Sequence, residues 1–239
     1  MVFLTSGIGD FLTLESHGLP HSSEYYLATP EQDRIADLLA LRDNPKIHKL
    51  WRSEFRFPCF LTIKHYTNTT GHQIEAADWS IAKQFYHPQP YNPSFLHTAN
   101  LPALVDYPQL KQPYCVIHPT TTRDKSQPKR ELSQQDWVAI EKQLKANHLL
   151  GVVVNDVYTS SANHFLNLSG QLNILQTLAL MKGATGYLGI DSFLSVFAAQ
   201  LPLTVFQVKT NRPHCRQWAD IYFSPHTSFG FLCDSLLVP

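Results

Sequence analysis

The chain has 239 residues, of which 44% are hydrophobic and 16% are charged, so a packed core is expected and a disordered chain is excluded. Its 19 basic and 19 acidic residues cancel, and basic residues are in slight excess only after residue 110. A nucleic-acid backbone usually requires a broad basic face, so the composition argues against a nucleic-acid partner. The basic excess of the second half suits one small anionic ligand better.

The four cysteines are isolated in the sequence, and no Cys-x-x-Cys pair is present. This usage is typical of a protein that keeps its thiols reduced. No basic segment followed by an apolar core opens the chain, and no apolar run is long enough to cross a membrane. We therefore expect a cytoplasmic protein without a transmembrane segment; peripheral contact with a membrane stays open.

The first half begins with the pattern of a strand, a glycine turn and a helix. Residues 2–5 are apolar and β-prone, Ser6 to Asp10 form a loop with two glycines, and a short helix is predicted from Phe11. A second strand is predicted at 25–28. A helix follows from Thr29 as N-cap, with Pro30 at its first position, to about Arg42. Two more strands are predicted at 49–52 and 60–63.

Six prolines between Tyr86 and Pro113 interrupt any regular element. We interpret residues 86–113 as a linker or extended wall and place a domain boundary near Lys111. The chain then consists of an N-terminal α/β domain, 1–110, and a C-terminal α/β domain, 111–239.

The second half alternates strands and helices about every 15–20 residues, which is typical of a parallel sheet with helices on both faces. The predicted elements are a strand at 114–118, a helix at 133–147 with Ser133 as N-cap, a strand at 151–154, a helix at 172–182, a strand at 186–190, a helix at 192–200 and a strand at 203–208.

Polar residues follow two of these strands. A loop rich in hydroxyls and cations comes after His118-Pro119, and Asp191-Ser192 comes after the strand at 186–190. Parallel strands bring ligands to their carboxyl ends, and hydroxyls, lysine and helix N-terminal amides bind phosphate there. The two junctions predict a pocket for a nucleotide diphosphate.

Four motifs, taken in order, resemble glycosyltransferase family 9, the ADP-heptose:lipopolysaccharide heptosyltransferases. Gly7-Ile8-Gly9-Asp10 resembles the family's opening turn. His118-Pro119, Thr121-Thr122-Arg123-Asp124 and a following lysine before a helix with Trp137 are similar to its donor-phosphate loop. Leu168-Ser169-Gly170 and Gly189-Ile190-Asp191-Ser192 are similar to two later motifs. The resemblance implies a GT-B-like α/β fold, with two Rossmann-like domains whose parallel sheets face across a cleft. It also implies a metal-independent glycosyltransferase that moves a sugar from a nucleotide-diphosphate sugar to a hydroxyl acceptor.

The resemblance implies a role for each matching residue. Asp10, on the acceptor side, would be the general base, although a helix cap is the alternative. The lysine that offsets the charge of the diphosphate would be Lys125 or Lys129. Asp156 is a weaker candidate for the ribose hydroxyls, where a plain turn is as good a reading. The other donor-binding candidates are Gly9, Thr121, Thr122, Asp191, Ser192 and Phe193, against the alternatives of a solvated polar loop and an ordinary N-cap pair.

The chain departs from the family pattern in two ways. Phe193 stands where the family usually has Gly, and Val196 stands where it usually has His. The chain is also shorter than expected, mostly in the first half, so the acceptor is not indicated. Two other functions therefore stay open: a non-catalytic nucleotide or sugar-nucleotide binding protein, and an interaction subunit that uses residues 86–113.

Several other kinds of site are not indicated. The histidines, His118 included, show no metal-ligand spacing, so we expect no metal, and we interpret His118 as a satisfied strand-end histidine. No P-loop and no Gly-x-Ser-x-Gly motif is present. Gly7-Ile8-Gly9 lacks the third glycine of a dinucleotide fingerprint. We expect no cofactor apart from the donor substrate.

Overall fold

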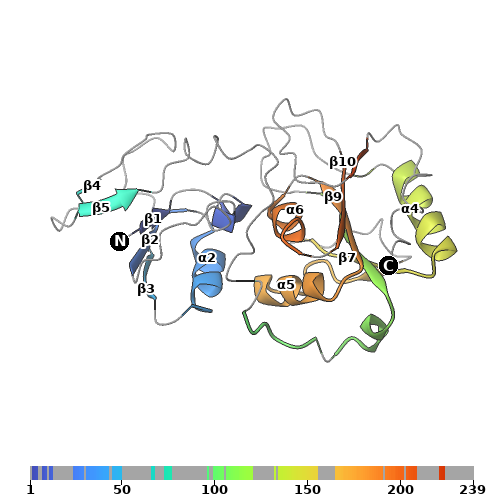
Figure 1. Cartoon of the computed structure of the whole chain (residues 1–239), viewed down its shortest axis with the longest axis horizontal. Helices are drawn as coiled ribbons and strands as arrows, with labels where there is room; N and C mark the ends of the chain where they lie inside the picture. Colours follow the sequence, from blue (N-terminus) through green and yellow to red (C-terminus); the bar gives the residue numbers. More distant parts are fainter. Residues whose placement is uncertain are drawn as a thin grey trace. The chain divides into compact units, whose positions relative to one another are not determined.

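The computed structural model shows an α/β protein that divides into two compact units, Met1–Asn100 and Leu101–Pro239 (Figure 1). The boundary expected at Lys111 lies in the second unit, at the end of the 3-10 helix η3 (Pro108–Lys111). None of the helices that the structure describes is long and apolar enough to span a membrane. The described residues are 2–4, 7–9, 11–12, 24–29, 31–42, 45–49, 66–67, 73–76, 96, 99–104, 106–120, 132, 134–155, 165–190, 192–201, 203–208 and 221–223.

Unit 1 contains a five-stranded sheet in the order β3-β2-β1-β5-β4. Its strands are β1 (Val2–Leu4), β2 (Glu24–Leu27), β3 (Lys46–Lys49), β4 (Tyr66–Thr67) and β5 (Gln73–Ala76). The sheet is parallel except at its edge, where β4 pairs with β5 in the antiparallel sense. Strand β3 begins three residues before the strand predicted at 49–52; residues 50–52 and the strand predicted at 60–63 lie outside the described residues.

The helix after β1 starts earlier than predicted. Ile8 and Gly9 are already helical, as are Phe11 and Leu12, and the amide of Phe11 donates to the carbonyl of Gly7 at 3.0 Å. A helix start at Phe11 is therefore wrong: Gly7 directly precedes the helix and Gly9 lies in its first turn. We call residues 7–12 the glycine turn, and of these Asp10 lies outside the described residues.

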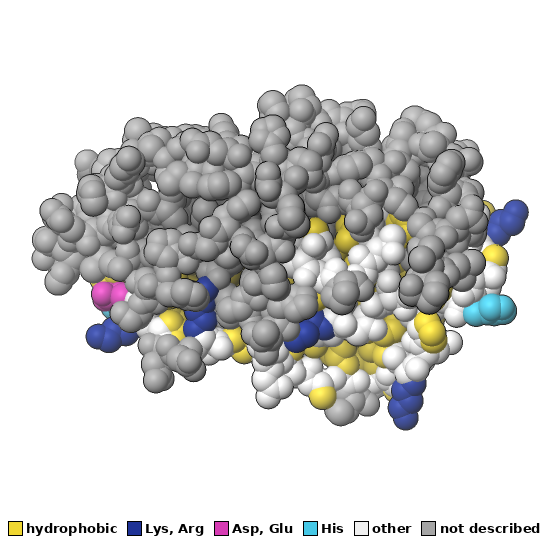
Figure 2. Space-filling model, in the orientation of Figure 1, with side chains coloured by type: hydrophobic (Ala, Val, Ile, Leu, Met, Phe, Trp, Pro, Cys, Tyr) yellow, Lys and Arg dark blue, Asp and Glu magenta, His cyan; other side chains and the backbone are white. Residues whose placement is uncertain are grey.

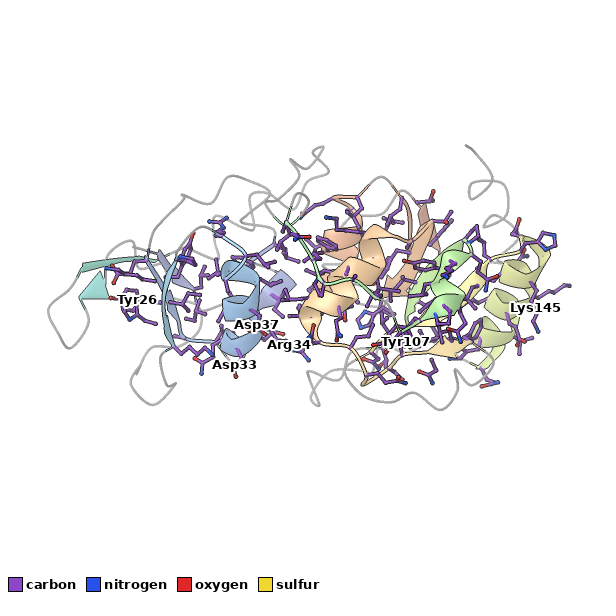
Figure 3. The ribbon with its side chains drawn as sticks, turned by 90° about the horizontal axis from the view of Figure 1, so that it is seen from below. Tyr26, Asp33, Arg34, Asp37, Tyr107 and Lys145 are labelled. Carbon is purple, nitrogen blue, oxygen red and sulfur yellow. The ribbon has the colours of Figure 1, made fainter. Side chains whose placement is uncertain are left out.

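Helix α2 (Gln32–Leu39) also differs from its predicted start. Its N-cap is Glu31, not Thr29. The Thr29 hydroxyl instead accepts the amide of Glu31 at 3.3 Å, which forms a turn just before the helix. The helix packs on β2 and β3 through its buried apolar side. Asp33 and Asp37, which are labelled in Figure 3, are exposed, as amphipathic patterning requires, and Asp33 Oδ1 lies 2.7 Å from Lys49 Nζ of β3.

Unit 2 contains a six-stranded, fully parallel sheet in the order β11-β10-β9-β6-β7-β8. Its strands are β6 (Tyr114–His118), β7 (Leu150–Val153), β8 (Leu166–Asn167), β9 (Gly186–Ile190), β10 (Thr204–Val208) and β11 (Ile221–Phe223). In chain order within the unit, the strands lie 3-2-1-4-5-6 from β8 to β11. This is the strand order of a doubly wound nucleotide-binding sheet.

The helices of unit 2 cover both faces of this sheet. Helix α4 (Gln134–Ala146) lies on one face, and α5 (Ile174–Lys182) and α6 (Phe193–Ala198) lie on the other (Figure 1). Strand residues alternate between the two faces. Cys115 and Ile117 pack with Trp137 and Ile140 of α4. The Tyr114 hydroxyl donates to the Leu180 carbonyl of α5 at 2.7 Å.

The predicted elements of the second half are confirmed with small changes of boundary. Strands β6 and β9 have the predicted ends, and α4, α5, α6, β7 and β10 lie within one or two residues of the predictions. Strands β8 and β11 were missed because segments of two and three residues are too short to show an alternating or continuous apolar pattern. Ser133 lies outside the described residues.

Candidate functional site

The candidate site lies at the point where the strand order of unit 2 reverses. Strands β6 and β9 are neighbours, and His118, the last residue of β6, pairs with Gly189 of β9. The chain leaves β6 toward α4 on one face of the sheet and leaves β9 toward α6 on the other. In open α/β sheets the two connections diverge at such a switch point and leave a crevice outside the carboxyl ends of the strands, where ligands bind.

Two side chains meet across this switch point. His118 Nδ1 lies 3.0 Å from the hydroxyl of Ser192, which follows β9 by two residues. His118 is only 6% exposed, in agreement with the interpretation of a satisfied histidine at a strand end. The hydrogen bond joins two motifs that lie 74 residues apart in the sequence.

Ser192 is the N-cap of α6. Its hydroxyl accepts the amide of Leu194 at 3.2 Å, and its own amide donates to Ser195 Oγ at 3.1 Å in a reciprocal capping box. The Tyr187 hydroxyl lies 3.5 Å from Ser192 Oγ. The Ser192 hydroxyl is thus held by the helix, by His118 and by Tyr187, so its position is defined before any ligand arrives.

Gly189 is required by the packing at this point. A Cβ on Gly189 would lie 2.5 Å from the Tyr187 hydroxyl and 2.9 Å from the His118 carbonyl oxygen. Tyr187 and Gly189 are two residues apart in β9 and share a face of the sheet, so the ring lies over the space that a side chain at 189 would occupy. The glycine therefore allows Tyr187 to reach Ser192.

A second turn, at Leu168-Ser169-Gly170, lies at the ends of β7 and β8. The amide of Gly170 donates to the carbonyl of Asn155, which follows β7, at 2.7 Å. Gly170 has a φ of 71°, in the left-handed region that favours glycine. Asn167 Oδ1 accepts the amide of Ser169 at 3.1 Å. The Leu168-Ser169-Gly170 motif is therefore a tight turn that joins the ends of β7 and β8.

The structure places only some of the predicted site residues. Ser192 and Phe193 lie at the switch point, and Phe193 is half-buried at the start of α6. Val196, at the family's usual His position, is fully buried in the core. Gly9 lies in the glycine turn of unit 1. The remaining candidates lie outside the described residues: Asp10, Thr121, Thr122, Lys125, Lys129, Asp156 and Asp191.

Sequence reasoning missed Glu31. Its carboxylate oxygen Oε2 accepts the amide of Ile8 at 2.5 Å, and the residue is only 4% exposed. The sequence signal was weak, because an acidic residue after Thr-Pro resembles an ordinary first-turn helix residue. The contact depends on the pairing of β1 with β2, which no local pattern reveals.

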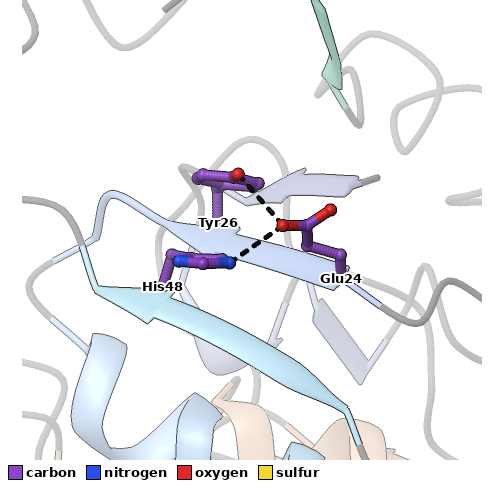
Figure 4. Close-up of polar contacts among 3 residues, drawn as sticks. All are labelled: Glu24, Tyr26 and His48. Atoms are coloured by element: carbon purple, nitrogen blue, oxygen red, sulfur yellow. Dashed lines mark hydrogen bonds and ion pairs between the residues drawn. The ribbon is translucent and has the colours of Figure 1, made fainter. Parts of the chain in front are cut away.

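A second polar cluster of unit 1 contains Glu24, Tyr26 and His48 (Figure 4). Glu24 Oε1 accepts from the Tyr26 hydroxyl at 3.2 Å and lies 3.0 Å from His48 Nε2, and the two rings stack at 4.4 Å. Burial acts to raise the pKa of Glu24, but the hydrogen bonds from Tyr26 and His48 and the nearby positive charges outweigh it and lower the pKa. The cluster is a cross-strand contact between β2 and β3.

The described surface shows no sign of a metal centre or a broad basic face. Among the described residues, no group of three or more His, Cys, Asp or Glu side chains could hold a metal ion. On the face drawn in Figure 2, the described Lys and Arg side chains are separated from one another and form no continuous basic surface.

Comparison with solved structures identifies the class of fold. The chain is similar to the dodecameric iron-containing glycosyltransferase TibC from enterotoxigenic E. coli, with a TM-score of 0.55 and 18% identity over 93% of this chain. It is also similar to E. coli heptosyltransferase WaaC with ADP, with a TM-score of 0.52 and 16% identity over 88% of this chain and 87% of WaaC. A family 9 glycosyltransferase from Veillonella parvula gives a TM-score of 0.57 and 7% identity over 93% of this chain and 84% of that one.

The chain therefore has an α/β fold like that of the glycosyltransferase family 9 heptosyltransferases, and the fold expected from the motifs is confirmed at this level. It spans 61% of the length of TibC. Neither a family model nor a curated protein matches the sequence.

Proposed function

We propose that this protein is a glycosyltransferase that moves a sugar, of the heptose kind, from a nucleotide-diphosphate sugar to a hydroxyl acceptor. The observation that carries the proposal is the contact of His118 with Ser192 at the switch point of a 3-2-1-4-5-6 sheet. This is where a doubly wound sheet binds a nucleotide. The heptosyltransferase-like fold and the order of the four motifs support it.

In this proposal unit 2 binds the donor. The loop after His118 supplies Thr121 and Thr122 as hydroxyl donors to the diphosphate, and Lys125 or Lys129 as a positive charge. The turn after β9 supplies the remaining contacts from Asp191, Ser192 and Phe193. A lysine offsets the negative charge that develops on the leaving diphosphate, so the transfer needs no metal ion.

Unit 1 then supplies the acceptor side. We propose that the two units face across a cleft and that Asp10 removes the proton from the acceptor hydroxyl as the anomeric carbon is attacked. The bond from that carbon to the diphosphate breaks, and the nucleoside diphosphate leaves. The acceptor is described only by its chemistry, as a hydroxyl group on a glycan, glycolipid or protein.

Two observations at α6 favour a second function: Val196 is buried in the core, and the half-buried Phe193 is the first residue of the helix. The family pattern has Gly and His at these positions. A binding protein that holds a sugar nucleotide without transferring the sugar would tolerate both changes. Catalysis by such a protein would be absent even with the donor bound.

Two measurements test the proposal. Calorimetric titration with ADP, UDP and GDP is expected to show that one nucleoside diphosphate binds. If none of the three binds, the remaining hypothesis is the interaction subunit. Mass spectrometry of a donor and acceptor mixture, or of donor alone, is then expected to show sugar transfer or slow donor hydrolysis. Activity that survives treatment with a chelator supports transfer without a metal, and donor binding without turnover supports the binding protein.

A further inference from the structure

Glu31 contacts the starts of two helices. Its backbone is the N-cap of α2, yet its side chain makes no capping hydrogen bond to that helix. The carboxylate instead accepts the amide of Ile8, 23 residues earlier in the chain, at 2.5 Å. One residue therefore begins α2 with its backbone and caps the helical glycine turn with its side chain.

The burial of this carboxyl group requires an explanation. Glu31 is 4% exposed, and a carboxyl group buried without hydrogen bonds destabilises the folded state. The amide of Ile8 is a first-turn amide, which has no partner within its own helix. A Ser, Asp or Asn at the N-cap usually accepts one of the first-turn amides, that of the second or third helical residue. Here a remote residue does so, and it connects two strand ends.

The surrounding hydrogen bonds hold Glu31 in place. The amide of Ala28, just after β2, donates to the carbonyl of Leu4, the last residue of β1, at 2.9 Å. The amide of Glu31 donates to the Thr29 hydroxyl at 3.3 Å. The backbone of Glu31 is therefore fixed relative to the end of β1. This restricts the positions that its carboxylate can take beside the glycine turn.

The contact between Glu31 and Ile8 lies at the end of the central strand β1. Strand β1 lies between β2 and β5, so the glycine turn leaves the sheet at the switch point of unit 1. At the equivalent position of a doubly wound sheet, a first-turn amide usually faces an anionic ligand. The Glu31 carboxylate takes that place at Ile8.

We propose that Glu31 is a positioning residue that holds the glycine turn through Ile8 and acts there as a built-in anion, so that unit 1 does not bind a phosphate at this amide. The inference rests on the proposed function, because the turn that Glu31 holds contains Asp10 in its sequence. It also gives a reason for the proposal that unit 2 binds the diphosphate, although both sheets have a switch point.

The kinetic consequence is a fall in kcat with an unchanged KM for the donor. Glu31→Ala removes the partner of the Ile8 amide, and a displacement of about 1 Å in a catalytic turn can lower turnover about 100-fold. Glu31→Gln keeps an oxygen that accepts the same amide, so it is expected to recover most of kcat. Leu39→Ala is the matched control, since Leu39 is equally buried but lies at the far end of α2.

A readout that does not need turnover is the amide signal of Ile8 in a nitrogen–proton NMR spectrum of the full chain. Glu31→Ala is expected to move this signal, and Glu31→Gln to leave it close to its original place. Glu31→Asp is a second variant that keeps the charge and the fold but is one methylene too short to reach, and it is expected to move the signal as Ala does. Sodium formate, added to Glu31→Ala, is expected to return the signal toward the original and to leave the unsubstituted protein unaffected.

These results separate the inference from the proposed function. If the unsubstituted protein binds a donor and transfers no sugar, the Ile8 signal and its rescue by formate still decide the role of Glu31. The inference is overturned if the Ile8 signal is the same in Glu31→Ala and Leu39→Ala, or if formate has no effect on Glu31→Ala. In an active protein, a fall in kcat no larger than that of Leu39→Ala also overturns it.

Discussion

His118 Nδ1 lies 3.0 Å from Ser192 Oγ and so joins the end of β6 to the cap of α6. A double-mutant cycle of His118→Ala and Ser192→Ala, measured by urea unfolding, is expected to give a coupling of about 0.5–3 kcal/mol, the range for residues in contact. Ser192→Thr keeps the hydroxyl and is expected to keep much of the coupling. Additive single substitutions would show that the contact contributes nothing to stability.

Gly189→Ala is expected to destabilise unit 2, because its Cβ would lie 2.9 Å from the His118 carbonyl oxygen and 2.5 Å from the Tyr187 hydroxyl. Overpacking of this kind costs about 1–3 kcal/mol in free energy of unfolding. Tyr187→Phe removes the nearer atom, so the double variant is expected to recover part of the loss but not all of it. Thermal unfolding of the three variants checks this, and a fully stable Gly189→Ala protein would contradict the packing.

Asp10→Asn is expected to lower turnover about 10²–10⁴-fold, the usual contribution of a positioned base, while donor affinity stays nearly unchanged. Donor affinity is preserved because we propose that unit 2 binds the donor. Single-turnover kinetics and calorimetry measure the two effects separately. Normal turnover in Asp10→Asn would mean that the base lies elsewhere, since Asn has the same shape and lacks only the basicity.

Lys125→Ala and Lys129→Ala distinguish the two candidates for the diphosphate contact. Loss of a charge-assisted hydrogen bond to phosphate is expected to weaken nucleotide binding by about 1.5–3 kcal/mol in one of the two variants. Lys111→Ala, at the end of η3, is a control for the removal of positive charge from the same unit. If both loop variants bind the nucleotide normally in calorimetry, the phosphates lie elsewhere.

Unit 2 is expected to lose stability at alkaline pH. Burial raises the pKa of the Cys115 thiol from 9.0 to about 12, and burial also raises the pKa of the Tyr114 hydroxyl to about 12. At a pH between the unfolded and the folded pKa of such a group, the folded protein keeps a proton that the unfolded chain has released. The free energy of unfolding therefore falls as the pH rises. The slope for Cys115 approaches about 1.4 kcal/mol per pH unit.

The alkaline prediction is checked by urea unfolding at several pH values between 8 and 11 in the original protein and in Cys115→Ala. The substitution lowers stability at every pH because it removes buried atoms, but it is expected to flatten the dependence on pH. An identical slope in the two proteins would show that the Cys115 thiol does not titrate in this way.

Local patterns in the sequence were sufficient to predict most elements of the second half, but not the short strands β8 and β11. All five residues of β6 and of β9 are buried, and all are apolar or glycine except His118 at the end of β6. Such runs reflect burial directly, so the ends of these strands can be predicted without knowing which strands pair. Strands β6 and β9 are neighbours in the sheet, so the two junctions begin on adjacent strands.

The boundaries that failed are those where a tertiary contact replaced a local one. Thr29 and Asp10 are good caps by residue type, but the N-cap of α2 is Glu31 and the first helix begins at Ile8. The cap of the Ile8 amide comes from Glu31, which is near only because β1 pairs with β2. Propensity is a weak preference, and a buried hydrogen bond between elements outweighs it.

The sequence by itself therefore determined the class of fold, most of the strand and helix pattern of the second half and the motifs that resemble a family of sugar transferases. Only the tertiary structure decided the strand order, and with it the switch point where His118 meets Ser192 and the separate place where Glu31 meets Ile8. The physical reason is that periodicity and capping report a residue's neighbours along the chain, whereas these contacts join residues 74 and 23 positions apart. Their positions follow from strand pairing, which is a property of the whole packed sheet.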